Sequence, residues 1–159
     1  PDPNTVYLLG AASTVRLWLV EEAMDLGLWR ARWLPGETAD LALLARLDKD
    51  HDGIINLVEY GFGLNPNLAD GPDARAALPH ARIRDGHLTV EFRKLAAAMD
   101  LEYVVEVSDD LVSWRSGSPH LEEVAVPDFA GNPEMLCVRD RTAIGSAVHR
   151  YIRVRVKVK

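Results

Sequence analysis

Hydrophobic positions change their period near residue 80, and this change predicts two different parts of the chain. Before residue 80, apolar residues recur at intervals of three or four, which is the spacing of an amphipathic helix. From His80 onward they alternate with polar residues, which is the spacing of a half-buried β-strand. We therefore expect an α+β fold, in which N-terminal helices precede an antiparallel β-sandwich-like domain.

Residues 80–159 are predicted to form the β domain, with six or so short antiparallel strands. Asp85 and Gly86 stand between two alternating segments, 81–84 and 87–93, and predict a hairpin with a two-residue turn. Further segments with strand character are 101–107, 121–126, 135–140 and 152–158. The single cysteine, Cys137, excludes an intrachain disulfide and is predicted to be a small buried hydrophobic residue.

Residues 1–36 are predicted to hold a short strand, at 5–9, and then a helix. Ser13 is a candidate N-cap for this helix. The apolar residues that recur near helical spacing are Leu17, Val20, Met24 and Leu28. We expect the nearby tryptophans, Trp18, Trp29 and Trp33, to belong to the core.

Residues 37–66 are predicted to form a helix, a loop and a second helix. Thr38 is the candidate N-cap of the first helix. Its predicted buried stripe consists of Leu41, Leu43, Leu44 and Leu47. Gly63 is expected to end the second helix, with Pro66 following. Residues 67–79, rich in Asp, Ala, Gly and Pro, are predicted to be a linker.

The loop between these two helices has the residue types of an EF-hand loop at every defining position. The six expected metal ligands are Asp48, Asp50, Asp52, Ile54, Asn56 and Glu59. The aspartates supply carboxylate oxygens, Ile54 its backbone carbonyl, and Glu59 both carboxylate oxygens. Calcium suits this set, because it is a hard cation that takes six to eight oxygen ligands in flexible geometry. We therefore predict one calcium ion here.

Two details of the loop bear on this prediction. Gly53 stands where the chain must turn sharply. Four carboxylates held close together also repel each other unless an ion lies between them. The alternative interpretation is a solvated acidic turn. EF-hands normally occur in pairs, yet the nearest acidic run, Asp70 to Asp73, lacks the spacing of a second loop. An unpaired loop favours a structural role over a sensor.

Residues 48–66 resemble a calcium-loop segment found near the C-termini of large secreted bacterial proteins, chiefly of Verrucomicrobia and Planctomycetes. That segment is similar to a dockerin or thrombospondin-type-3 loop. The resemblance continues in the β part at 88–93, 100–114 and 150–153, and covers the chain from about Trp29 to its end. It implies an extracellular, non-catalytic module. His51 departs from the family pattern, which has Gly there, and residues 1–28 have no counterpart.

Charge and composition narrow the classes of partner. The net charge is −6, which argues against nucleic acid as a partner. The basic residues near the C-terminus alternate with Val and are predicted to lie on one face of a strand. No apolar run is long enough to predict a membrane span. The chain begins without Met and without a signal-peptide pattern, so we expect a mature or excised part of a longer protein.

No catalytic motif stands out, and we expect no enzyme activity. The histidines lack zinc-site spacing, and the sequence contains no nucleophile elbow or phosphate loop. One alternative is a self-assembling subunit of an extracellular filament or surface layer, with strand exchange between copies. Either the 5–9 segment or the terminal strand up to Lys159 could pair with a sheet edge of a neighbouring copy. A weaker alternative is a carbohydrate-binding module that uses Trp114. Against the latter, we expect Trp114 and Leu111 to be buried against the sheet.

Overall fold

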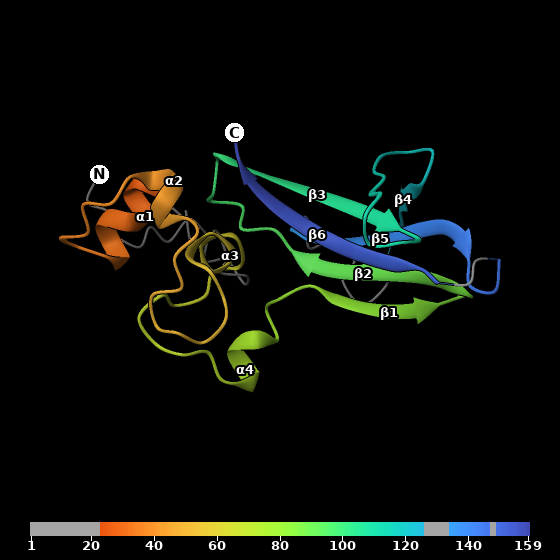
Figure 1. Cartoon of the computed structure of the whole chain (residues 1–159), viewed down its shortest axis with the longest axis horizontal. Helices are drawn as coiled ribbons and strands as arrows, with labels where there is room; N and C mark the ends of the chain where they lie inside the picture. Colours follow the sequence, from red (N-terminus) through yellow and green to blue (C-terminus); the bar gives the residue numbers. More distant parts are fainter. Residues whose placement is uncertain (1–22, 126–133, 147–148) are drawn as a thin grey trace, which may run out of the picture.

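The computed structural model describes residues 23–125, 134–146 and 149–159. Short helices lie at one end of the molecule and antiparallel strands at the other (Figure 1). The predicted strand at 5–9 lies outside the described residues, as do Ser13, Leu17, Trp18 and Val20. The prediction of a β-rich α+β fold with antiparallel sheets is confirmed.

Helix α1 spans Leu26–Trp33. Asp25 is its N-cap and accepts a hydrogen bond from the Leu28 backbone N–H at 2.8 Å. Met24, predicted to be helical, instead forms a parallel β-bridge with Ala98, because the chain is extended up to the cap. Leu28 lies in α1 as predicted, but its side chain is 56% exposed and does not belong to a buried stripe.

Helix α2 (Leu41–Leu44) is a single turn, so an EF-hand pair of helices does not flank the loop. Its N-cap is Asp40 and not Thr38, because the Asp40 carboxylate accepts from the Ala42 N–H at 2.9 Å. One turn of helix cannot bury a whole stripe. Leu44 is buried, whereas the other three leucines of the predicted stripe are exposed: Leu41, Leu43 and Leu47.

Helix α3 (Asn56–Phe62) follows the loop and ends at Gly63 as predicted, in the left-handed conformation with φ of 71°. Helix α4 (Pro72–Arg75) is one turn within the segment that was predicted as a linker. Together α3 and the segment with α4 connect the acidic loop to the first strand (Figure 1).

The strands form two antiparallel sheets, one with the order β1-β2-β5-β4 and one that pairs β3 with β6. Their bounds are β1 His80–Arg84, β2 His87–Arg93, β3 Leu101–Ser108, β4 Leu121–Glu123, β5 Met135–Ala143 and β6 Tyr151–Val158. All six predicted strands are therefore present. The predicted hairpin turn joins β1 to β2, and both of its residues, Asp85 and Gly86, have positive φ, at 50° and 74°.

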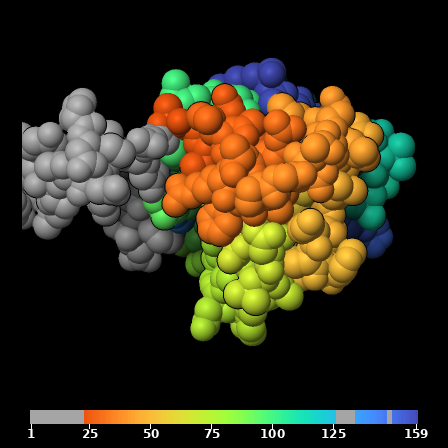
Figure 2. Space-filling view, turned by 90° about the vertical axis from the view of Figure 1, so that its left-hand side faces the viewer, coloured from red at the N-terminus to blue at the C-terminus, as the bar shows by residue number. Residues whose placement is uncertain are grey.

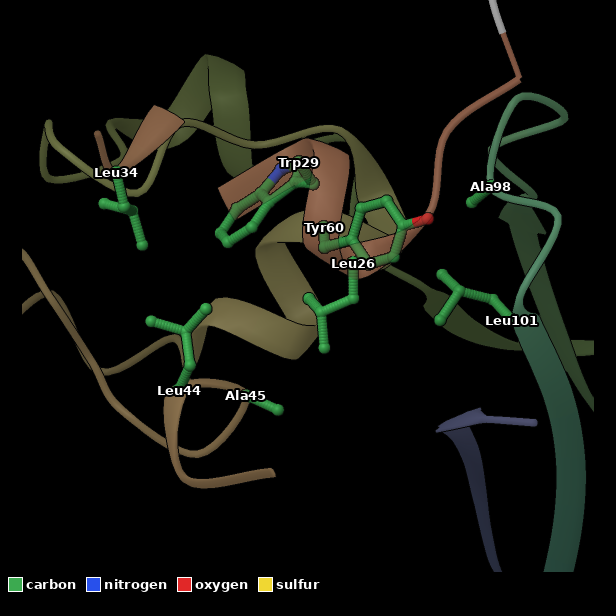
Figure 3. Packing of buried hydrophobic residues seen from close by; sticks show 8 residues of the cluster. All are labelled: Leu26, Trp29, Leu34, Leu44, Ala45, Tyr60, Ala98 and Leu101. Atoms are coloured by element: carbon green, nitrogen blue, oxygen red, sulfur yellow. The ribbon is translucent and has the colours of Figure 1, made fainter. Parts of the chain in front are cut away.

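The helical end has its own hydrophobic core, built mainly from α1, α2 and α3 (Figure 3). Trp29 and Tyr60 form its centre, with ring centroids 5.7 Å apart. The Tyr60 hydroxyl donates to Asp100 Oδ1 at 2.6 Å, just before β3, so the core is tied to the β domain. The Tyr103 hydroxyl of β3 donates to the Gly61 carbonyl at 2.6 Å. Helix α3 therefore links the two parts of the fold.

Tyr60→Phe is expected to lower the free energy of unfolding by about 1–3 kcal/mol, because it leaves a partly buried carboxylate oxygen of Asp100 without its donor. Urea unfolding measures the effect. Tyr151→Phe is the control, since no hydrogen bond of its hydroxyl is found among the described residues, and it should change stability by less than about 0.5 kcal/mol. Equal effects of the two variants would contradict the role of Tyr60 as a tie.

Trp114 is half-buried rather than buried, and Leu111 is 56% exposed, so the prediction that both pack onto the sheet was wrong. Polar contacts hold the indole instead. Its Nε1 donates to the Leu111 carbonyl at 3.1 Å, and the Arg153 guanidinium lies 3.8 Å from the ring centroid. Arg153 also pairs with Glu106 at 2.8 Å, so the basic residues of β6 take part in cross-strand ion pairs.

Cys137 is buried, at 3% exposure, as predicted. Burial, and then the nearby Glu91 carboxylate, raise the pKa of its thiol, which disfavours the nucleophilic thiolate.

None of the helices in residues 23–125, 134–146 and 149–159 is long and apolar enough to cross a membrane.

Candidate metal centre

The loop of residues 48–59 is closed at its base by backbone hydrogen bonds between its two ends. The Asn56 N–H donates to the Leu47 carbonyl at 2.7 Å, and the Leu57 N–H donates to the Ala45 carbonyl at 3.0 Å. Within the loop, Gly53 has φ of 92° and His51 has φ of 63°. These left-handed residues turn the chain back on itself, so its polar side chains face a common centre.

Three carboxylates meet inside the turn. One oxygen from each of Asp48, Asp50 and Asp52 lies within 4.8 Å of the other two. Backbone N–H groups of the same turn hold them in place: Gly53 donates to Asp48 Oδ2 at 2.9 Å, and Ile54 donates to Asp52 Oδ1 at 2.8 Å. The sequence thus folds locally so that carboxylates which repel each other are fixed side by side.

Buried oxygen atoms without a hydrogen-bond partner gather around these carboxylates. They are Asp50 Oδ2, Asn56 Oδ1, Glu59 Oε1, Glu59 Oε2 and Asp70 Oδ2. Within the part of the chain that the structure describes, no other buried side-chain nitrogen or oxygen lacks a partner. A folded protein rarely leaves even one buried polar group unsatisfied, because each costs about 1–3 kcal/mol. Five in one cluster, all oxygen, form a set of acceptors of the kind that a hard cation could satisfy.

Helix α3 supplies the most deeply buried of these groups. Asn56 and Glu59 are both 0% exposed, although an isolated carboxylate is among the groups least often found buried. The Asn56 amide is oriented by its Nδ2, which donates to the Leu44 carbonyl of α2 at 2.9 Å. This bond leaves Asn56 Oδ1 as the free acceptor, so the residue presents an oxygen and not an N–H group.

The electrostatics of the cluster reflect crowded negative charge. Burial raises the pKa of Glu59 to about 8, and the charges of Asp50, Asp52, Asp70 and Asp48 add to this effect. Burial likewise raises the pKa of Asp70, with further contributions from Asp52 and Asp50. A cation at the centre would attract the ionised carboxylates and so lower the pKa values that their mutual repulsion raises.

Comparisons of the chain with protein-family models, with curated proteins and with solved structures find no match.

The predicted ligands are brought together to different degrees. Asp48, Asp50 and Asp52 form the closest set, and Glu59 and Asn56 add buried, unpartnered oxygens from α3. Glu59 does not belong to the closest set of carboxylates among the described residues. Ile54, predicted to use its backbone carbonyl, is 6% exposed, and its N–H is taken by Asp52.

Asp70 and Arg75 are the residues near the loop that the sequence analysis did not identify. Asp70 was considered only as part of a second loop, for which its spacing is wrong. Its backbone N–H donates to Asp52 Oδ2 at 2.9 Å, and Arg75 Nη2 lies 3.1 Å from the same oxygen. One feature of the sequence could have drawn attention to Asp70: this residue is the first acidic one after the proline that follows α3.

Proposed function

We propose that the chain is a non-catalytic extracellular calcium-binding structural module, in which the ion stabilises the junction between the helical part and the β domain. The observation that supports this most is the cluster of five buried oxygen atoms that lack a hydrogen-bond partner. An oxygen-rich, negatively charged cluster suits a hard cation, whereas a site for a softer metal would contain His or Cys.

Calcium fits the donor set better than magnesium does. Calcium accepts six to eight oxygens in irregular geometry, and a glutamate can bind it through both carboxylate oxygens. Both oxygens of Glu59 are buried and unpartnered, as such a bidentate ligand requires. Magnesium demands octahedral geometry and retains several water molecules, which a fully buried carboxylate would exclude.

Helix α3 is the reason that an ion in the loop would act on the junction. Glu59 faces the loop, while the two residues after it contact the rest of the fold. Tyr60 bonds to Asp100, and Gly61 lies so close to β6 that a Cβ there would be 3.2 Å from Val156 Cγ1. An ion that holds Glu59 in place would therefore also hold Tyr60 and Gly61 in their contacts with the β domain.

Calcium is expected to raise the melting temperature of the protein, and magnesium to raise it much less. An ion that binds only the folded state stabilises it by about 2.7 kcal/mol at a hundredfold excess over Kd. For a chain of this size that corresponds to roughly 5–10 °C. Thermal melts in chelator, in calcium and in magnesium provide the test. Identical curves in all three solutions would refute the proposed function.

The alternative of a self-assembling subunit draws on residues 5–9, which lie outside the described residues, and on the terminal strand, which pairs with β3 in a two-stranded sheet. It stays a prediction. Measuring the particle size of the purified chain in solution tests it directly. The carbohydrate-binding alternative is weakened by Arg153, whose guanidinium covers a face of the Trp114 ring on which a sugar would stack.

Extracellular calcium is millimolar, a concentration that would fill even a weak single calcium site of this kind.

A further inference from the structure

Asp70 reaches the acidic loop from a different part of the chain. It lies between α3 and α4, and its backbone is fixed at both polar atoms. The Asp70 N–H donates to Asp52 Oδ2 at 2.9 Å, and its carbonyl accepts from Arg75 Nε at 3.0 Å. In Figure 2 the segment around α4 lies directly beside the loop on the helical end of the molecule. The side chain of Asp70 is thus carried into the cluster by ordered backbone.

The Asp70 carboxylate is placed as a ligand would be. Its Oδ2 is buried and has no hydrogen-bond partner, in common with the oxygens of Asp50, Asn56 and Glu59. Arg75, the nearest cation, does not satisfy this oxygen. The Arg75 guanidinium is directed at Asp52, where Nη2 donates to the backbone carbonyl at 2.6 Å and lies 3.1 Å from Oδ2.

The state of Asp52 explains why an additional ligand is needed. Asp52 Oδ2 accepts from both the Asp70 N–H and Arg75 Nη2, so its lone pairs are occupied by protein donors. Only Oδ1, which accepts from the Ile54 N–H, retains acceptor capacity. The loop alone therefore provides fewer free oxygens than its sequence suggests, while a calcium ion takes six to eight.

We propose that Asp70 is a direct ligand of the metal ion, so that the site is completed by a residue outside the twelve-residue loop. This inference rests on the proposed function. The ion would then join three consecutive parts of the chain: the loop, α3 and the segment that leads to β1. Arg75 is a positioning residue, which orients Asp52 and Asp70 through their backbone and offsets part of the added negative charge.

The experiment counts the water molecules on the ion with terbium in place of calcium. Terbium binds oxygen sites of this type, and its luminescence decay in H₂O and in D₂O gives the number of coordinated waters. We expect Asp70→Ala to gain about one coordinated water relative to the unchanged chain. Calcium affinity, measured by calorimetry, should fall at least about tenfold. Asp70→Asn keeps a side-chain oxygen, so its water count should stay unchanged while its affinity falls.

Asp73→Ala is the matched control, because Asp73 is an exposed aspartate of the same segment, in the first turn of α4. It should leave both water count and affinity unaltered. An unchanged water count in Asp70→Ala would overturn the role of Asp70 as a ligand, provided that Glu59→Gln still loses binding. If Glu59→Gln binds calcium as tightly as the unchanged chain, the proposed function itself fails.

Discussion

Glu59→Gln is expected to abolish most of the thermal stabilisation by calcium, with a fall in calcium affinity of about a hundredfold or more. Glu59 is completely buried, and both of its carboxylate oxygens lack a hydrogen-bond partner. The variant therefore removes no hydrogen bond of the described fold, and its main effect should be on the ion. Glutamine keeps the shape of the side chain but replaces one oxygen by an N–H₂ group and removes the charge. Calorimetric titration and calcium-dependent melting measure the loss.

When calcium is absent, Glu59→Gln should raise the stability of the folded chain instead of lowering it. Burial and the surrounding aspartates raise the pKa of Glu59 to about 8, so at neutral pH its ionisation opposes folding. Removing the carboxyl removes this opposition. We expect the melting temperature of Glu59→Gln in chelator to exceed that of the unchanged chain by roughly 5 °C at pH 8. A residue that merely packs would lower stability in both conditions.

A pH dependence of stability follows from the same carboxyl. Its pKa is higher in the folded, metal-free chain than in the unfolded chain, so the folded state binds the extra proton between the two values. The stability that this proton provides is fully present below about pH 4.5 and is lost as the pH rises to about 8. This loss should be absent in Glu59→Gln.

His51→Gly serves as the control within the loop. His51 is exposed and has φ of 63°, a conformation that glycine adopts without strain. We expect unchanged calcium affinity and a free energy of unfolding that is equal or higher by up to about 1 kcal/mol. If His51→Gly weakened calcium binding as much as Glu59→Gln, the loop would depend on its backbone conformation and not on its carboxylates.

The strands and the acidic loop were predictable because their signals are local. Alternation of apolar and polar residues located all six strands, and the two-residue turn at Asp85 and Gly86 set the register of the first hairpin. The spacing of the carboxylates in the loop was likewise visible in the sequence. Both patterns depend on neighbours within a few residues, so tertiary contacts did not override them.

The helices and the position of Asp70 beside the loop were not predictable in the same way. Helix α2 has one turn because Asp40 caps it late and the loop begins soon afterwards. A run of leucines does not reveal where such a cap lies, since Asp and Thr are both good N-caps. Asp70 reaches the cluster through a tertiary contact with Asp52. Spacing rules for a single loop cannot identify a residue that arrives from outside it.

Arg150→Ala is expected to lower the free energy of unfolding by about 3–5 kcal/mol, the largest loss that we expect away from the acidic loop. Arg150, just before β6, joins strand β5 to the loop after β3. Its guanidinium bonds to both oxygens of Asp140 on β5 and to Asp109 after β3, the latter at 2.7 Å. The Asp140 side chain is 0% exposed, so the variant would leave a carboxylate buried without its cation. Urea unfolding measures the effect.

Two further variants decide whether the buried charge is the cause. Arg93→Ala removes a surface ion pair with Glu134, in which the Arg93 side chain is 55% exposed, and should cost less than about 1 kcal/mol. Adding Asp140→Asn to Arg150→Ala removes the uncompensated charge, while the asparagine oxygen can still accept from the Thr142 N–H, as Asp140 Oδ1 does at 2.9 Å. This double variant should recover part of the lost stability. A double variant less stable than Arg150→Ala would contradict the uncompensated charge of Asp140 as the cause of the loss.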